Sequence, residues 1–163
     1  MIRAVHEHEH ETFAGDQDYA VCAVHNVLIL IWHGGITEAS LESSREAGIE
    51  MNRRFPKGIG SFIVAREGIP LPSADIREIS ETNMREASHW VREAAIVIEG
   101  EGFWSSAARS IYTAMVLFSR VPYGQKVFRD VRPAGAWLAA SLEDGPSPDE
   151  LERVIAATRA RFV

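Results

Sequence analysis

The pattern of hydrophobic positions starts with two short apolar runs, Tyr19–Val24 and Val27–Trp32, separated only by His25 and Asn26. A two-residue break between such runs is typical of a tight β-hairpin. The second run is apolar on both faces, as expected of a strand that is covered on both sides. We therefore expect a hairpin whose second strand lies inside a sheet.

Three rounds of amphipathic helix and short apolar strand follow the hairpin. The spacing of apolar positions predicts helices over 38–55, 74–91 and 106–120, and strands over Ile59–Ala65, 95–98 and 126–131. Thr37 and Ser73 stand where side chains cap helix N-termini. Charges alternate along 126–131, which favours an edge position for this strand.

Two further helices complete the pattern. One begins near Pro133, and the other begins at Ser147 and Pro148 with Glu150 completing a capping box. This order of elements predicts an α/β fold with a mixed central sheet of about five strands and helices packed on it. Residues 1–18 form an arm or an edge strand, 19–144 the main domain, and 145–163 a C-terminal helix.

Composition narrows the class of protein. With 163 residues, 46% of them hydrophobic, the chain fits one globular domain. Its net charge of -6 gives no general attraction to nucleic acid or to anionic lipid, and its apolar runs are too short to span a bilayer. Cys22 is the single cysteine and lies in an apolar run, so we expect an inert thiol and a cytoplasmic location, with no nucleic-acid partner and no membrane insertion.

Two local features accompany the order of elements. The segment 126–131 precedes Ala136, Trp137 and Leu138, and the strand of 27–32 closes on a Gly-Gly pair before a helix cap. Together these features resemble the STAS family, the SpoIIAA-like or anti-sigma-factor-antagonist-like domains, over roughly residues 19–142. The resemblance implies a SpoIIAA-like fold and regulated binding of a protein partner, and it carries over no catalytic residue.

STAS domains hold a phosphoacceptor serine in an Asp-Ser-x-Gly turn between the third strand and the second helix. The corresponding turn of this chain contains Ser73 without the flanking Asp and Gly. The resemblance therefore implies Ser73 as a candidate phosphoacceptor, whose phosphate a helix N-terminus would stabilise. The residue pattern alone favours a plain N-cap.

A second candidate site is a cleft at the strand ends, where open α/β sheets usually bind ligands. Such a cleft would gather residues of two loops into a ligand or partner surface, namely Pro70, Pro72, Ser73, Gly102, Phe103, Trp104 and Ser105. An apolar ligand or a nucleotide would fit this position. Glu99 and Glu101 beside the glycines disfavour a pyrophosphate, because like charges repel.

The helix predicted over 106–120 is apolar nearly all round. A helix of this kind is expected to be buried twice, by its own sheet and by another surface. Tyr112, Val116 and Leu117 lie on one side of it and are candidate interface residues. We therefore expect a protein partner, and self-association into a homodimer is one form of it.

The sequence thus favours a non-enzymatic regulatory or protein-interaction module without a cofactor. A small-molecule binding domain is the first alternative. The second is an enzyme that uses Glu99 or Glu101 with His33 as acid and base. His6, His8 and His10 alternate with glutamates and are weak candidates for a metal site.

Overall fold

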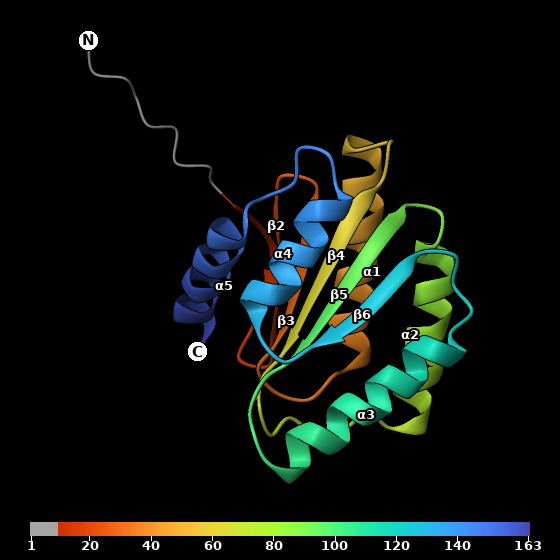
Figure 1. Ribbon diagram of the computed structural model, residues 1–163, viewed down its shortest axis with the longest axis vertical. Coiled ribbons are helices and arrows are strands. Elements are labelled where there is room, and N and C mark those ends of the chain that lie inside the picture. The colour runs from red at the N-terminus through yellow and green to blue at the C-terminus, as the bar shows by residue number, and fades with distance from the viewer. Residues whose placement is uncertain (1–9) are drawn as a thin grey trace.

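In the computed structural model, which describes residues 10–163, a six-stranded sheet forms the centre of the molecule (Figure 1). The strands follow one another across the sheet in chain order: β1 (Glu11–Gly15), β2 (Tyr19–Val24), β3 (Val27–Trp32), β4 (Ile59–Ala65), β5 (Val91–Ile98) and β6 (Gly124–Phe128). The pairs β1–β2 and β2–β3 are antiparallel, and the pairs from β3 to β6 are parallel. The predicted α/β class with a mixed sheet and an opening hairpin is confirmed.

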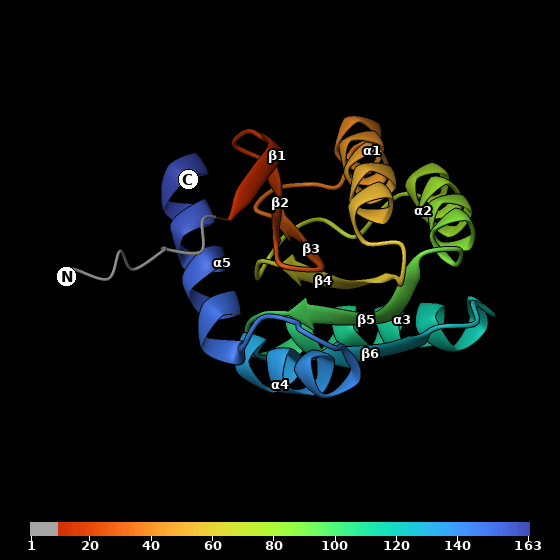
Figure 2. The ribbon, with the colours of Figure 1, turned by 90° about the horizontal axis from the view of Figure 1, so that it is seen from above.

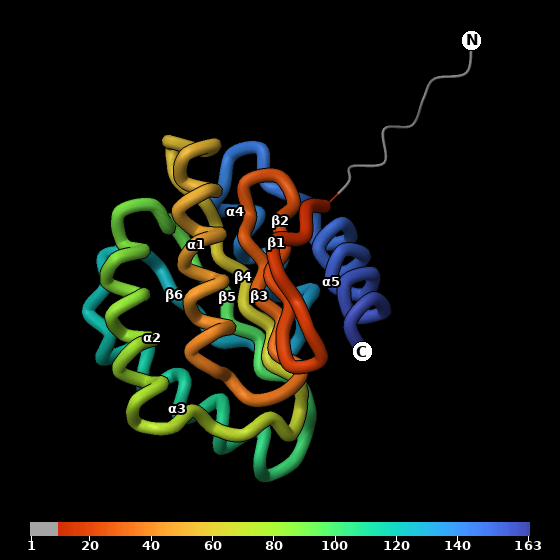
Figure 3. Tube along the Cα trace, turned by 180° about the vertical axis from the view of Figure 1, so that it is seen from behind, coloured from red at the N-terminus to blue at the C-terminus, as the bar shows by residue number. Residues whose placement is uncertain are grey.

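Five helices cover the two faces of this sheet. They are α1 (Glu38–Arg54), α2 (Ala74–Ala87), α3 (Phe103–Phe118), α4 (Val131–Ser141) and α5 (Pro148–Phe162). The first three connect the parallel strands and belong to one face, whereas α4 and α5 pack on the other (Figures 1 and 3). Within residues 10–163, no helix is both long and apolar enough to cross a membrane.

The alternation of side chains along each strand divides the core in two. Leu28, Leu30 and Trp32 of β3 face α1, while Val27, Ile29 and Ile31 face α4 and α5. Strand β3 is buried along its whole length, as its two apolar faces predicted.

Side-chain caps begin three of the helices, as predicted. The Thr37 hydroxyl accepts from the Ser40 amide at 3.2 Å, and the Ser73 hydroxyl accepts from the Ile76 amide at 3.3 Å. Ser147 and Glu150 form the predicted capping box, in which each side chain accepts from the other's backbone N–H. Each cap satisfies amides that have no partner inside the helix.

Several predicted boundaries were wrong. Helix α2 ends at Ala87 instead of 91, and β5 begins at Val91 instead of 95, because residues 91–94 join the ladder beside β4. Helix α3 begins at Phe103 instead of 106, directly after Gly102, whose φ of 93° suits glycine. The last strand spans Gly124–Phe128 instead of 126–131, and Asp130 already stands at the N-cap position of α4, without a side-chain cap hydrogen bond.

The N-terminal segment provides a sixth strand, one more than expected. Strand β1 pairs with β2 and lies at the sheet edge. Arg54 of α1 holds it in place, since its guanidinium bonds to Glu11 and lies 5.6 Å from the centroid of the Phe13 ring. Helix α5 packs beside β2 through Leu151, Val154 and Ile155 and so belongs to the core.

Candidate functional site: an apolar cavity under helices α1, α2 and α3

Small side chains lie in the middle of the sheet on the face that α1, α2 and α3 cover. The strand register aligns Leu28 of β3 with Ser61 of β4, then Ala94 of β5 and Gln125 of β6. The next row along the same face consists of larger side chains, Leu30, Ile63, Ile96 and Val127. The row with Ser61 and Ala94 is therefore a depression in the sheet surface.

Helix α2 does not fill this depression. It lies beside α1 (Figure 2), and every residue of α2 stays at least partly exposed, although Ile76, Ile79 and Ala87 pack against the edge of the core. An ion pair reinforces this placement, because Arg45 of α1 donates to both carboxylate oxygens of Glu86 on α2, at 2.7 and 3.0 Å. The helix layer is thus held away from the small side chains of the sheet.

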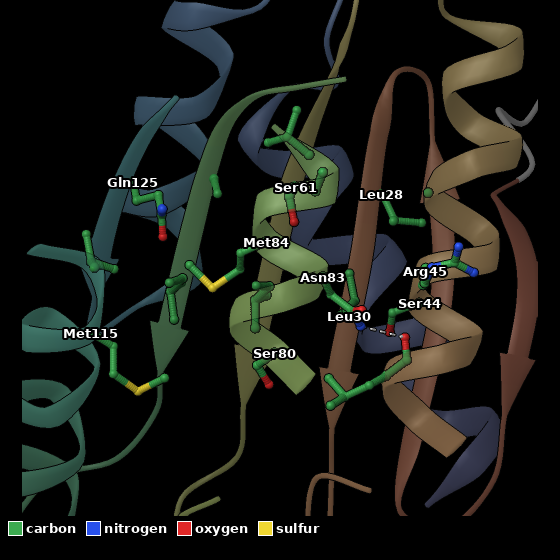
Figure 4. A pocket seen from close by; sticks show the side chains of 18 of the residues that line it. Leu28, Leu30, Ser44, Arg45, Ser61, Ser80, Asn83, Met84, Met115 and Gln125 are labelled. Atoms are coloured by element: carbon green, nitrogen blue, oxygen red, sulfur yellow. Dashed lines mark hydrogen bonds between the residues drawn. The ribbon is translucent and has the colours of Figure 1, made fainter. Parts of the chain in front are cut away.

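A cavity of about 170 Å³ lies between the sheet and this helix layer (Figure 4). Its wall comes from all three helices and from β3 to β6, and most of its side chains are apolar: Leu28, Leu30, Trp32, Ile36, Leu41, Ile63, Met84, Trp90, Ile96, Met115 and Val116. An apolar cavity of about 150 Å³ is large enough to bind benzene. The space is therefore sufficient for a small apolar molecule.

Polar groups in the wall are few and mostly engaged. Ser44 and Ser80 donate their hydroxyls to carbonyls of their own helices, and the Asn83 amide donates to the Leu41 carbonyl. The Gln125 amide donates to Ser119. Within the described part of the chain, the hydroxyls of Ser61 and Tyr112 have no hydrogen-bond partner, and Ser61 points into the cavity (Figure 4).

Burial affects the tyrosines of the wall. Removal from water raises the pKa of Tyr112 to about 12, and it does the same for Tyr123. Both phenols are therefore protonated at neutral pH and able to donate. Tyr123, directly before β6, donates to the Met84 carbonyl at 3.5 Å and so links the start of this strand to α2.

The predicted strand-end surface is only partly assembled. Pro72 reaches the cavity wall, and Ser73 lies beside it as an exposed N-cap. Phe103 is 91% exposed, Gly102 is exposed and Trp104 is partly buried. Ser105 is fully buried, where it donates to the Glu99 carbonyl, so it does not belong to an open surface. Pro70 is exposed.

The predicted interface residues face in different directions. Tyr112 and Val116 point inward and line the cavity, whereas Leu117 is 74% exposed. Within the chain, Ser105 and Ala108 are the fully buried residues of α3, and the second covering surface expected for this helix stays a prediction. Phe118 is 81% exposed at its C-terminal end, where it lines an open hollow of about 730 Å³ between α2 and α3.

The acid and base residues weighed from the sequence, Glu99 or Glu101 with His33, do not form one hydrogen-bonded set. Arg159 donates to both oxygens of Glu99 at 2.9 and 2.7 Å, and Arg129 donates to Glu101 at 2.9 Å. The buried ring nitrogens of His33 have no hydrogen-bond partner among the described residues. The three side chains are thus engaged elsewhere or unpaired, and none lines the cavity.

The glycine loop after β5 is blocked as a phosphate cradle. Gly100 and Gly102 both have positive φ, but the Glu67 side chain lies where a Cβ on Gly100 would be placed. Its carboxylate adds negative charge to that of Glu101 beside the loop. Of the histidines weighed for metal binding, His6 and His8 lie outside the described residues, and among residues 10–163 no cluster of three His, Cys, Asp or Glu could hold a metal ion.

Comparison with protein-family models, with curated proteins and with solved structures found no match to this chain. The STAS resemblance thus stays a prediction. The cavity itself was missed by sequence reasoning, although one signal for it was present. Ser61 and Ala94 are small residues inside two strands that also carry Ile, Val and Phe, but only the strand register shows that they are neighbours.

Proposed function

We propose that this protein binds a small, mainly apolar molecule in the cavity between its sheet and helices α1, α2 and α3. The observation that carries the proposal is the cavity itself, about 170 Å³ with a largely apolar wall. An empty apolar cavity destabilises a fold, because its wall loses van der Waals contacts. A larger residue at Ser61 or Ala94 would remove that cost, so a cavity kept open at this position favours binding as its purpose.

The chemistry of the cavity wall favours a binding function over an enzymatic one. Among the residues that the structure describes, the wall contains no His, Cys, Asp, Glu or Lys, and its hydroxyls come from Ser and Tyr. These side chains bind and orient a molecule but hold no assembled nucleophile and base. We infer a binding protein that acts in the cytoplasm, as its single cysteine suggests.

A cavity-filling variant tests this function. Wild-type protein is titrated with 2-ethylnaphthalene by calorimetry, and its thermal midpoint is expected to rise with ligand concentration. Ser61→Leu places an isobutyl group in the cavity and is expected to abolish both signals. Ser110→Leu, at an exposed position of α3, adds the same group outside the cavity and is expected to bind like wild type. Equal binding by wild type and Ser61→Leu would contradict the proposal.

A regulatory role through a protein partner is the second candidate. Leu117 and Phe118, 74% and 81% exposed, form an apolar pair at the end of α3. Large exposed apolar side chains that adjoin one another favour an interaction surface. Ser73 lies near the cavity with its hydroxyl exposed, so phosphorylation there would change the charge beside Pro72.

Sedimentation of wild type and of the double variant Leu117→Ser/Phe118→Ser tests self-association through the apolar pair. A wild type that stays monomeric at high concentration would exclude a homodimer.

A further inference from the structure

The charge of the cavity wall constrains what it can bind. Arg45 is the only charged side chain in the wall, as far as the structure describes the chain. Each nitrogen of its guanidinium group already has a carboxylate partner: Nε and Nη2 donate to Glu86, and Nη1 donates to Glu42 at 3.3 Å. One cation thus faces two carboxylates, and no cationic group is left for an anionic ligand.

The remaining polar groups indicate which ligand atoms are accepted. Asn83 and Gln125 each use one amide N–H within the protein, so a second N–H and the carbonyl oxygen of each amide remain, and neither amide carries a charge to pair with an anion. The unengaged donors of the wall among the described residues are the hydroxyls of Ser61 and Tyr112, the indole N–H of Trp90 and the second N–H of each amide. These donors are all uncharged, and they suit a carbonyl or hydroxyl oxygen on an otherwise apolar molecule.

We propose, resting on the binding function above, that the cavity selects an uncharged ligand with one hydrogen-bonding oxygen and excludes carboxylates of the same shape. A buried carboxylate without a cationic partner is far more costly than a buried carbonyl that accepts a hydrogen bond. Ser61 and Tyr112 orient the ligand through its oxygen. Arg45 serves to hold α1 and α2 together and takes no part in ligand binding.

Three ligands of one skeleton test the selection: 2-acetylnaphthalene, 2-ethylnaphthalene and 2-naphthoate, titrated into the full chain by calorimetry at pH 7.5. The acetyl compound is expected to bind most tightly. The ethyl compound, which lacks the oxygen, is expected to bind about 5- to 10-fold more weakly. The carboxylate, ionised at this pH, is expected to bind at least about 100-fold more weakly than the acetyl compound.

The outcomes separate the two proposals. Comparable binding of 2-naphthoate and 2-acetylnaphthalene would overturn the selection against charge and leave the binding function standing. Equal binding of the acetyl and ethyl compounds would overturn the role of the hydroxyls. Failure of all three to bind wild-type protein would overturn the binding function and the selection together.

Single substitutions show which side chains produce the preference for the acetyl compound. Tyr112→Phe and Ser61→Ala, which each remove one hydroxyl, are expected to lower affinity for the acetyl compound toward that of the ethyl compound, whose own affinity stays unchanged. Thr82→Ala, which removes an exposed α2 hydroxyl that donates to Glu78, is the matched control and is expected to change neither. An unchanged acetyl preference in both hydroxyl variants would contradict the assignment.

Glu86→Gln tests the electrostatic argument directly, because it removes one of the two carboxylates that face Arg45. Affinity for 2-naphthoate is expected to rise about tenfold, while affinity for the acetyl compound stays the same. Glu46→Gln removes an exposed carboxylate one residue beyond Arg45 on α1 and serves as the control. A gain in naphthoate affinity that is equal in the two variants would show that net charge, not the pairing of Arg45, decides the selection.

Discussion

Ser61 of β4 and Ala94 of β5 are direct neighbours across the parallel ladder, and their small side chains form the floor of the apolar cavity. The next row along the same face carries Leu30, Ile63, Ile96 and Val127, and the first three of these larger side chains also line the cavity. The cavity thus results from two small residues in one row together with the position of α2 against α1. This relationship leads to the first of four predictions.

Ser61→Leu should stabilise the protein. The larger side chain fills space that is empty and adds buried apolar area, so we expect the free energy of unfolding to rise by about 1–2 kcal/mol. Denaturant unfolding followed by tryptophan fluorescence measures the change. Ser110→Leu, at an exposed position, is expected to stay within about 0.5 kcal/mol of wild type. Destabilisation by Ser61→Leu would mean that the cavity is too narrow for the added group.

The Cys22 thiol should be unreactive in the folded protein. Burial raises its pKa to about 11, and the Thr158 hydroxyl donates to its Sγ at 3.6 Å. Because the thiolate is the reactive form, labelling by a disulfide reagent at pH 8 is expected only when the protein unfolds. The labelling rate should therefore follow the denaturant curve. Rapid labelling of folded protein would show that β2 opens locally.

His33 should make the fold less stable in mild acid. Burial lowers its pKa below the ordinary 6.5, and the nearby positive charges of Arg159 and Arg66 lower it further. The unfolded chain therefore binds this proton more readily, so stability is full above pH 6.5 and decreases as the pH falls below it. His33→Phe should lose less stability than wild type between pH 7.5 and pH 5, measured as denaturation midpoints. An identical loss in both proteins would assign the effect to other groups.

Glu50 should contribute to stability only while it is ionised. Hydrogen bonds from Arg53 and Arg54 lower its pKa from 4.5 to about 2. Its contribution is therefore complete above pH 4.5 and is lost as the pH falls toward 2. We expect the acid unfolding curve of Glu50→Gln to be flatter than that of wild type over this range. Added salt should shrink the difference, because these side chains are exposed to solvent and screened; a difference insensitive to salt would contradict the ion-pair origin.

Local rules determined most of the elements from sequence alone. The two residues His25 and Asn26 between apolar runs made the hairpin, and both predicted strands match the observed bounds. Thr37, Ser73 and Ser147 capped the predicted helices because a cap depends only on residues three positions away. The predicted helix ran to 91 and the predicted strand began only at 95, because the charged pair Arg92 and Glu93 inside a strand does not look like a strand until its neighbour strand is known.

The sequence by itself therefore determined the order and type of the elements and the two-sided burial of β3, since these depend on spacing and on contacts nearby in the chain. The cavity was decided only by the tertiary structure. Ser61, Ala94, Tyr112 and Arg45 come from four separate elements, and their meeting depends on strand register and on where α2 packs. Contacts between segments that are distant in the sequence set both the strand register and the position of α2. The periodicity of a single segment carries no information about such contacts.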